Sequence, residues 1–192
     1  MTRELEIEFK NLLTQEEYIK LLDSFGYKPT DAHTQINHYF DTADYKLRAQ
    51  KSALRIRQKG EAYECTLKVP AENGNYEITD TLDQQQAEDI LKKSNFAAEE
   101  VADALKEIGV SPKNLDILGT LATHRIEFPY RNGLLVLDHS EYHGIEDFEL
   151  EFEVDDFHDG KRKFHDLLIE HNIPSRKTDK KIARFMKASK KD

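Results

Sequence analysis

The sequence predicts an α+β protein dominated by an antiparallel sheet of about eight strands, enough to close into a barrel with helices packed outside. Three observations support this prediction. Charged and apolar residues alternate in many segments, which is the period of a strand with one buried face. Short turn signals separate those segments, as they do in hairpins. Helical spacing is confined to a few stretches, so strands should make up most of the fold.

The chain opens with a strand at residues 4–10 and a helix soon after it. In ELEIEFK the alternation places all the ionisable side chains on one face of the strand. Those residues are Glu4, Glu6, Glu8 and Lys10, and the opposite face carries Leu5, Ile7 and Phe9. Thr14 and Glu17 then have the spacing of a capping box, and Gly26 supplies a stop signal, so a helix is expected between them.

The middle of the chain predicts four strands followed by two short helices. Residues 34–42 and 75–82 each have strand character, and residues 53–60 and 62–70 read as a hairpin that turns near Gly60. Between about 83 and 109 the apolar residues change to helical spacing in two pieces. This predicts two helices inserted between strands.

The last third returns to strands at 118–130, 133–142 and 147–155, with a hairpin turn predicted at Asn132-Gly133. A helix is expected from about Phe157 to His171, before Pro174, and a short basic helix at the end of the chain. No repeat, low-complexity tract or linker divides the sequence, so we expect a single domain over residues 1–192.

Composition restricts the functional classes. The formal net charge of −9 argues against nucleic-acid binding, which depends on a basic surface. No apolar run reaches the roughly 20 residues of a membrane helix, and the chain does not open with a signal-peptide pattern. We therefore expect a cytoplasmic monomer or homodimer without membrane contact. Cys65 is the single cysteine, so an internal disulfide is excluded and the residue is expected to fill core space.

Ionisable residues occupy one face of nearly every predicted strand. The segment DFELEFEVD repeats the opening pattern, with Glu149, Glu151 and Glu153 on one face. One interpretation is an open sheet whose charged face is solvated. The other is a barrel whose charged faces line a tunnel, which requires that opposite charges interleave or that bound ions complete the pairing. Carboxylate clusters favour Mg²⁺ or Mn²⁺, and converging Arg and Lys favour phosphoryl oxygens, so a metal-chelated chain of phosphates would satisfy both.

A family resemblance decides between the two interpretations. Glu6-Ile7-Glu8-Phe9-Lys10 matches the E-x-E-x-K signature of the CYTH family, the triphosphate tunnel metalloenzymes. The segments YFDT, LRIR, TLK, YEI, THR, LD and ELEFE follow in the order and rough spacing of that family. The chain therefore resembles a small, single-domain bacterial member over nearly its whole length. The resemblance implies an eight-stranded antiparallel barrel that cleaves triphosphate compounds with Mg²⁺ or Mn²⁺.

The resemblance also implies roles for individual residues. The carboxylates of the metal site would be Glu6, Glu8, Glu77, Asp138, Glu149, Glu151 and Glu153. The phosphate-binding residues would be Lys10, Arg55, Arg57, Lys68, Arg125, Lys181 and Arg184. Among these, Glu153 would act as the catalytic base, while Lys10 and Arg57 would stabilise the transferring phosphoryl group. The C-terminal match is partial, because the family's S-K-Y-x-R appears here as KKIAR, and a solvent-facing Lys181 is the alternative.

Hydrolysis of inorganic tripolyphosphate is the function that the sequence favours, because charged walls suit phosphate groups and no aromatic pair is set aside for a base. The alternatives are a class IV adenylyl cyclase, a thiamine triphosphatase, and a non-enzymatic module that binds polyphosphate or nucleotides. The histidines are expected to have structural or surface roles. His158 and His165 lack a third ligand signal, and His124 should face away from the tunnel because it alternates with Arg125.

Overall fold

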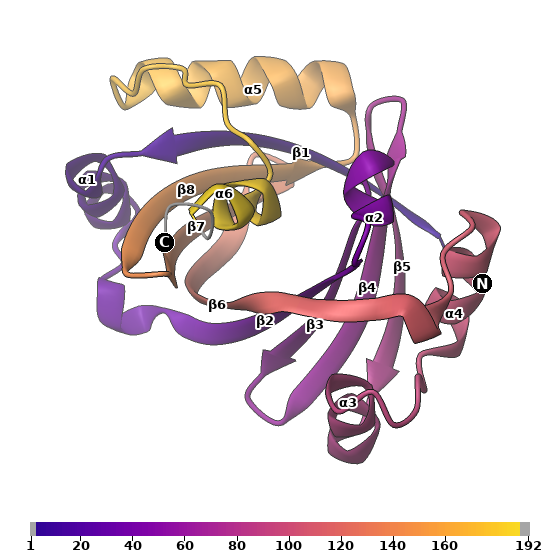
Figure 1. Cartoon of the computed structure of the whole chain (residues 1–192). Helices are drawn as coiled ribbons and strands as arrows, with labels where there is room; N and C mark the ends of the chain where they lie inside the picture. The colour runs from indigo at the N-terminus through magenta and orange to yellow at the C-terminus, as the bar shows by residue number, and fades with distance from the viewer. Residues whose placement is uncertain (1–2, 189–192) are drawn as a thin grey trace. The chain divides into compact units, whose positions relative to one another are not determined.

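The computed structural model describes residues 3–188. Across that range the strands close into one antiparallel barrel in the order β1-β5-β4-β3-β2-β6-β7-β8, which confirms the predicted fold class (Figure 1). The strands are β1 (Glu4–Leu13), β2 (His33–Thr42), β3 (Ala53–Lys59), β4 (Ala62–Ala71), β5 (Gly74–Leu82), β6 (Leu115–Tyr130), β7 (Gly133–Tyr142) and β8 (Ile145–Val154). The helices are α1 (Gln15–Phe25), α2 (Lys46–Ala49), α3 (Gln84–Leu91), α4 (Glu99–Glu107), α5 (Phe157–Glu170) and α6 (Lys181–Ala188), with 3-10 turns at Pro29–Asp31 and Pro112–Asn114.

The chain forms two compact units. The first unit holds Gln35–Leu121 together with the start of the chain up to Leu5. The second unit holds Glu6–Thr34 and the chain from Ala122 onward. No helix among the described residues combines the length and the apolar character needed to cross a membrane.

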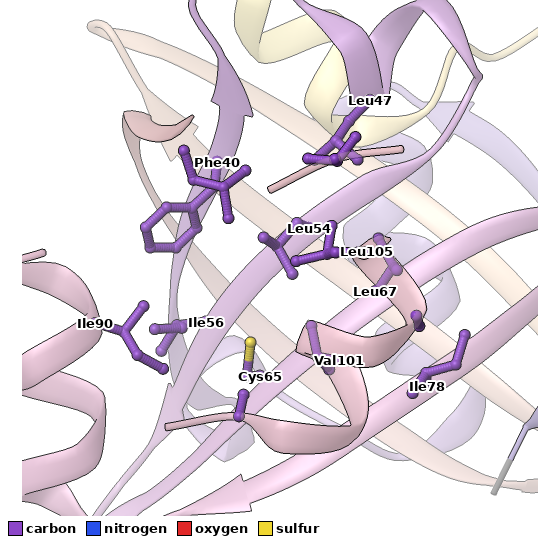
Figure 2. Packing of buried hydrophobic residues seen from close by; sticks show 14 of the residues in the cluster. Phe40, Leu47, Leu54, Ile56, Cys65, Leu67, Ile78, Ile90, Val101 and Leu105 are labelled. Carbon is purple, nitrogen blue, oxygen red and sulfur yellow. The ribbon is translucent and has the colours of Figure 1, made fainter. Parts of the chain in front are cut away.

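The core of the first unit lies between the sheet β3-β4-β5 and the helices α3 and α4. Leu54 and Ile56 alternate with Arg55 and Arg57 along β3, so the apolar side chains share one face and the charged ones the other. On the apolar face, buried side chains from neighbouring strands and helices pack together (Figure 2). Cys65 is buried in this core, as the sequence predicts.

The core of the second unit lies between β7 and β8 on one side and α1 and α5 on the other. Leu150 and Phe152 of β8 are fully buried there, together with Leu167 of α5 and Leu22 of α1. Burial of one such side chain contributes about 1.5–3 kcal/mol to folding. Because these residues alternate with glutamates in β8, the same packing turns the glutamates to the opposite face of the strand.

The first helix begins and ends where the sequence predicts. The hydroxyl of Thr14 accepts a hydrogen bond of 3.2 Å from the backbone N–H of Glu17, and the carboxylate of Glu17 accepts one of 2.8 Å from the backbone N–H of Thr14. This reciprocal capping box satisfies two N–H groups that the helix leaves free. Gly26 ends the helix with a φ of 79°, a left-handed conformation that glycine adopts without a Cβ penalty.

The turn between β6 and β7 differs from the prediction by one residue. Arg131 and Asn132, rather than Asn132 and Gly133, have positive φ values of 46° and 61° and form the two-residue turn. Gly133 is the first residue of β7, and a Cβ there would lie 2.5 Å from the carbonyl oxygen of Glu153. The glycine is therefore required by close backbone approach between β7 and β8 rather than by the turn.

Candidate active site

The strand register of the second unit gathers ionisable residues on one face. Asp138 of β7 lies opposite Arg125 of β6 on one side and opposite Glu149 of β8 on the other. In the next part of the ladder, Lys10 of β1 lies opposite Glu151 of β8. Since directly opposed residues point to the same face of a sheet, these side chains from four strands converge.

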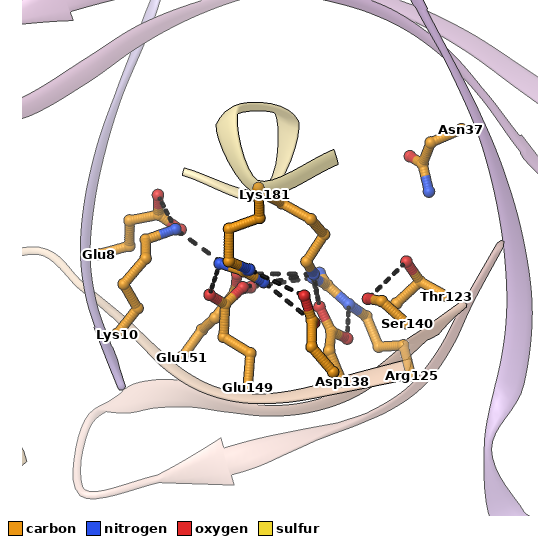
Figure 3. A network of polar contacts seen from close by, with 12 residues as sticks. Glu8, Lys10, Asn37, Thr123, Arg125, Asp138, Ser140, Glu149, Glu151 and Lys181 are labelled. Atoms are coloured by element: carbon orange, nitrogen blue, oxygen red, sulfur yellow. Dashed lines mark hydrogen bonds and ion pairs between the residues drawn. The ribbon is translucent and has the colours of Figure 1, made fainter. Parts of the chain in front are cut away.

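Arg125 links two of the carboxylates on this face. Its Nε donates a hydrogen bond of 2.8 Å to Asp138 Oδ1, and its Nη2 donates one of 2.7 Å to Asp138 Oδ2 and one of 2.9 Å to Glu151 Oε2 (Figure 3). All three residues are buried. Burial lowers the pKa of Arg125, but the two carboxylates outweigh it and hold the pKa well above its usual value. The guanidinium is therefore a fixed positive charge.

Helix α6 adds two more cations to the same face. The ammonium of Lys181 projects onto the carboxylate of Asp138, and it lies 3.5 Å from Glu149 Oε1 and 3.9 Å from Glu151 Oε1 (Figure 3). Arg184 donates a hydrogen bond of 2.6 Å to Glu149 Oε2 and one of 2.8 Å to Asp147 Oδ2. The Lys181 side chain is 12% exposed, so the alternative of a solvent-facing lysine is wrong.

A network of long-range contacts fixes the segment that leads into α6. Arg176 makes two hydrogen bonds of 2.8 Å with the carboxylate of Glu17 in α1. The side chain of Asn11 in β1 accepts a hydrogen bond of 2.6 Å from the backbone N–H of Arg176 and donates one of 3.1 Å to the carbonyl oxygen of Pro174. These contacts hold Pro174 and Arg176, a few residues before α6, against β1 and α1.

Two carboxylates on this face, those of Glu149 and Glu153, have raised pKa values. Burial, together with the negative charge of Glu151, raises the pKa of Glu149 to about 7 despite the contact with Lys181. Burial also raises the pKa of Glu153 to about 7, with Glu6 and Glu151 adding repulsion. Oε1 of Glu149 is buried and accepts no hydrogen bond from the described residues.

Strand β1 contributes two acids and one base to this face. Lys10 Nζ lies 2.7 Å from Glu8 Oε1 and 3.6 Å from Glu151 Oε1. Glu8 lies opposite Glu153 in the ladder, and Glu6 is close enough to Glu153 to raise its pKa. The E-x-E-x-K segment therefore places its three ionisable side chains beside the acids of β8, as the sequence predicts.

The donor groups on this face suit a hard divalent cation. Carboxylate oxygens of Asp138, Glu149 and Glu151 all lie within 4.8 Å of one another. Such all-oxygen sets are the ligands that Mg²⁺ and Mn²⁺ prefer. The ammonium of Lys181 contacts all three carboxylates, so a cationic charge is already stabilised at that point. Near Glu6 and Glu8, burial and the negative charges of these neighbours raise the pKa of Glu153, and a bound cation would offset that repulsion.

The first unit carries a second set of predicted residues on one face of β3-β4-β5. Lys68 of β4 lies opposite Glu77 of β5, and their side chains form an ion pair. Arg57 donates a hydrogen bond of 3.1 Å from Nε to the side-chain oxygen of Asn37 in β2. Nε of Arg55 is buried and has no hydrogen-bond partner among the described residues. An unpaired buried N–H of a charged group is costly, which suits a residue whose partner is an anionic ligand.

The predicted site residues thus fall into two groups. In the second unit they are Glu6, Glu8, Lys10, Arg125, Asp138, Glu149, Glu151, Glu153, Lys181 and Arg184, and in the first unit Arg55, Arg57, Lys68 and Glu77. That both groups face one substrate stays a prediction. Sequence reasoning missed Asp147, the partner of Arg184, although it continues the alternation of Glu149 and Glu151 by one more step. It also missed Asn37, for which the sequence carries no particular signal.

The fold and the charged faces define a class: a closed antiparallel barrel whose strands carry acids and bases on one face. The chain belongs to the CYTH domain family, whose model matches residues 4–186. YjbK of Bacillus subtilis (strain 168), described as a candidate triphosphatase, is 39% identical over 193 residues, covering 100% of this chain and 99% of that protein.

Solved structures agree with the fold. A Bacillus halodurans protein described as a candidate adenylate cyclase has a TM-score of 0.92 at 40% identity, covering 96% of this chain and 99% of the other. HpAC1 from Hippeastrum, an adenylyl cyclase candidate described as having a dominant triphosphatase activity, has a TM-score of 0.77 at 24% identity, covering 95% and 96%. The second likeness shows the fold alone.

Proposed function

We propose that this protein hydrolyses triphosphate compounds with the help of a divalent cation, and that inorganic tripolyphosphate is its preferred substrate. The observation that carries the proposal is the buried set of acids around Arg125 and Lys181, in which burial, with added repulsion from neighbouring carboxylates, raises the pKa of Glu149 and Glu153 to about 7. A module that only binds anions would gain nothing from these carboxylates. A metal-chelated phosphate chain requires them together with the neighbouring cations.

The acids of the second unit would hold Mg²⁺ or Mn²⁺. We assign Glu6, Glu8 and Glu153 to this role first, because these carboxylates come together where β1 pairs with β8. Asp138, Glu149 and Glu151 form the other group of carboxylates, and Glu77 is the corresponding acid of the first unit. A bound divalent cation would neutralise phosphoryl oxygens and polarise the phosphorus that is attacked.

The bases would bind the phosphate chain. Arg55, Arg57 and Lys68 share one strand face in the first unit, and Lys10, Arg125, Lys181 and Arg184 share one face in the second. Guanidinium groups can bind phosphoryl oxygens in a bidentate manner, and preorganised donors stabilise the charge that develops during transfer. Lys10 and Arg57 would act on the transferring phosphoryl group.

Glu153 would take a proton from the attacking water. A base is most effective when its pKa lies near the working pH, and the pKa of Glu153 is raised to about 7. The carboxylate would orient the water and accept its proton as the water oxygen bonds to the terminal phosphorus and the P–O bond to the departing pyrophosphate breaks. Arg57 and Lys10 would stabilise the transferring phosphoryl group. No covalent intermediate on the protein is required.

An adenylyl cyclase is the second candidate, because the Bacillus halodurans relative at 40% identity is described as a candidate cyclase. Cyclisation would use the same phosphate and metal contacts, but the ribose hydroxyl would attack in place of water. The two reactions differ in their products. Hydrolysis of ATP releases phosphate, whereas cyclisation gives cyclic AMP and pyrophosphate.

The test is a substrate panel with purified protein. Tripolyphosphate, ATP and thiamine triphosphate are each incubated with and without Mg²⁺ or Mn²⁺, and phosphate, pyrophosphate and cyclic AMP are quantified. We expect metal-dependent phosphate release, with the highest kcat/KM for tripolyphosphate. More efficient formation of cyclic AMP from ATP would contradict the proposal in favour of the cyclase, and a lack of turnover with every substrate would contradict both.

Single-residue variants test whether the proposed site residues are responsible for the activity. Arg57→Ala should lower kcat/KM by about 10²–10³-fold, the effect of removing one preorganised donor. Glu8→Gln should lower kcat and raise the metal concentration needed for half-maximal activity. Arg162→Ala, at an exposed position of α5, is the matched control and should leave both parameters unchanged. Normal kinetics in the first two variants would remove these residues from the site.

A further inference from the structure

A cluster of two histidines and a glutamate lies on the face of β6 and β7 opposite the charged site. His124 of β6 and His139 of β7 are directly opposed in the ladder, and Glu141 follows two residues later on the same face of β7. Ligand atoms of the three side chains all lie within 4.8 Å of one another. We call His124, His139 and Glu141 the outer histidine cluster.

The spacing within the cluster is slightly wider than that of ligands around a tetrahedral zinc ion. Nε2 of His124 lies 3.5 Å from Glu141 Oε1, and Nε2 of His139 lies 3.9 Å from the same oxygen. Two ligands that each lie about 2.0–2.1 Å from a tetrahedral Zn²⁺ are about 3.4 Å apart. The atoms are thus too far apart for strong hydrogen bonds, but a cation between them would need only small side-chain movements.

Neighbouring residues already orient both imidazole rings. Nδ1 of His124 lies 2.9 Å from the hydroxyl of Thr34. This contact suits the tautomer in which Nδ1 donates its proton, because a metal-binding histidine gives its other N–H to a nearby acceptor. The ring of His139 stacks on Phe148 at a centroid distance of 4.6 Å and an angle of 16°. Holding both rings reduces the entropy lost when a metal binds.

A further ligand is within reach. Oε2 of Glu146 lies 3.2 Å from Nε2 of His139. The side chains of Glu141 and Glu146 are 51% and 57% exposed, so they can change rotamer at little cost. Glu146 or a water molecule could therefore complete four-coordinate geometry around a metal held by the outer histidine cluster.

We propose that the outer histidine cluster is a binding site for Zn²⁺ or a similar first-row transition metal, separate from the Mg²⁺ or Mn²⁺ site on the opposite face. The ligand chemistry separates the two sites. Imidazole nitrogen suits Zn²⁺, whereas Mg²⁺ takes oxygen ligands. The site would join β6 to β7 at the ladder position next to the Arg125–Asp138 pair, and so hold the strands that carry that pair.

Isothermal titration with ZnCl₂ in a large excess of Mg²⁺ tests the proposal, because Mg²⁺ saturates carboxylate sites without occupying an imidazole site. We expect one Zn²⁺ per chain. The double variant His124→Gln/His139→Gln should bind it at least about 100-fold more weakly, since loss of ligands exceeds the 10–100-fold effect of losing their supporting groups. Glu141→Gln should weaken binding while retaining both imidazoles.

The matched control is His158→Gln/His165→Gln, which removes two histidines from α5 and should leave the affinity unchanged. Replacement of Zn²⁺ by Co²⁺ adds a spectroscopic readout, because the visible absorption of a four-coordinate site should appear in the wild type and disappear in the double variant. Circular dichroism checks that the variants are folded. Equal affinity in the wild type and the double variant, or no Zn²⁺ binding in the presence of Mg²⁺, would overturn the proposal. Neither outcome depends on triphosphatase activity.

Discussion

The substitution Arg125→Met tests the energetic role of the buried ion pairs. It removes three hydrogen bonds of 2.7–2.9 Å, two to Asp138 and one to Glu151. The side chains involved are almost fully buried, with exposures of 9% for Arg125, 0% for Asp138 and 7% for Glu151. Methionine retains an unbranched apolar side chain, so the main loss is the charge and its hydrogen bonds.

Breaking a buried ion pair by removing one partner costs about 3–5 kcal/mol, because the remaining charge is left without compensation. Lys181 still contacts both carboxylates in the variant, so the lower end of that range applies. We therefore expect a loss of about 3 kcal/mol in the free energy of unfolding. For a chain of this size, that corresponds to a decrease in Tm of roughly 6–12 °C.

The loss should depend on pH in a definite direction. Burial by itself would raise the pKa of Asp138. The positive charges of Arg125 and Lys181 outweigh that effect and lower the pKa below its usual value. A lowered carboxyl pKa stabilises the folded state above the unfolded pKa, and that contribution disappears as the pH falls through the folded pKa. Without Arg125 the carboxylates take up a proton more readily. The difference in unfolding free energy between variant and wild type should therefore be largest at neutral pH and should decrease in acid.

Urea unfolding followed by circular dichroism, in buffer with a chelator, measures this difference without interference from bound metal. Arg131→Met is the matched control, because Arg131 also contacts both oxygens of one carboxylate, at 2.7 and 2.8 Å from Glu170, but the side chains are 36% and 49% exposed. Exposed pairs contribute little to stability. A loss in Arg125→Met equal to that of the control, or one that grows in acid, would refute the reasoning.

Three further predictions follow from single positions. The pKa of the Cys65 thiol is raised by burial, so iodoacetamide should label it only after unfolding, as measured by mass spectrometry; rapid labelling of the native chain would contradict its placement in the core. Gly133→Ala should lower the unfolding free energy by about 1–3 kcal/mol, because its Cβ overlaps the backbone of β8, and an unchanged urea midpoint would contradict the register. In metal-free buffer the Tm should fall as the pH rises from about 5 to 8. The pKa of Glu153 is raised to about 7 in the folded chain, so the folded chain holds this proton more tightly than the unfolded chain and loses that stabilisation when the proton dissociates. Glu153→Gln should weaken that dependence in a thermal unfolding series, and an identical slope in the variant would exclude Glu153 as its source.

Local sequence signals determined much of this protein. The capping box of Thr14 and Glu17 defines the start of α1, and alternation defines the strands and the face on which each ionisable residue lies. These features depend on residues at most four positions apart, so they can be recognised along the chain. The charge alternation, matched to a family pattern, was enough to predict the barrel and the acids that Arg125 and Lys181 contact.

Other features depend on residues that only the tertiary structure brings together. Lys181 contacts Asp138, which lies 43 positions earlier, and Arg176 contacts Glu17, which lies 159 positions earlier. The outer histidine cluster exists because the register opposes His124 to His139, and a shift of one residue would turn every side chain of a strand to the other face. From the sequence Gly133 looks like a turn glycine, but glycine is required there because a Cβ would overlap the backbone of β8. Periodicity tells which face a residue occupies, but register and packing decide which residues it meets there.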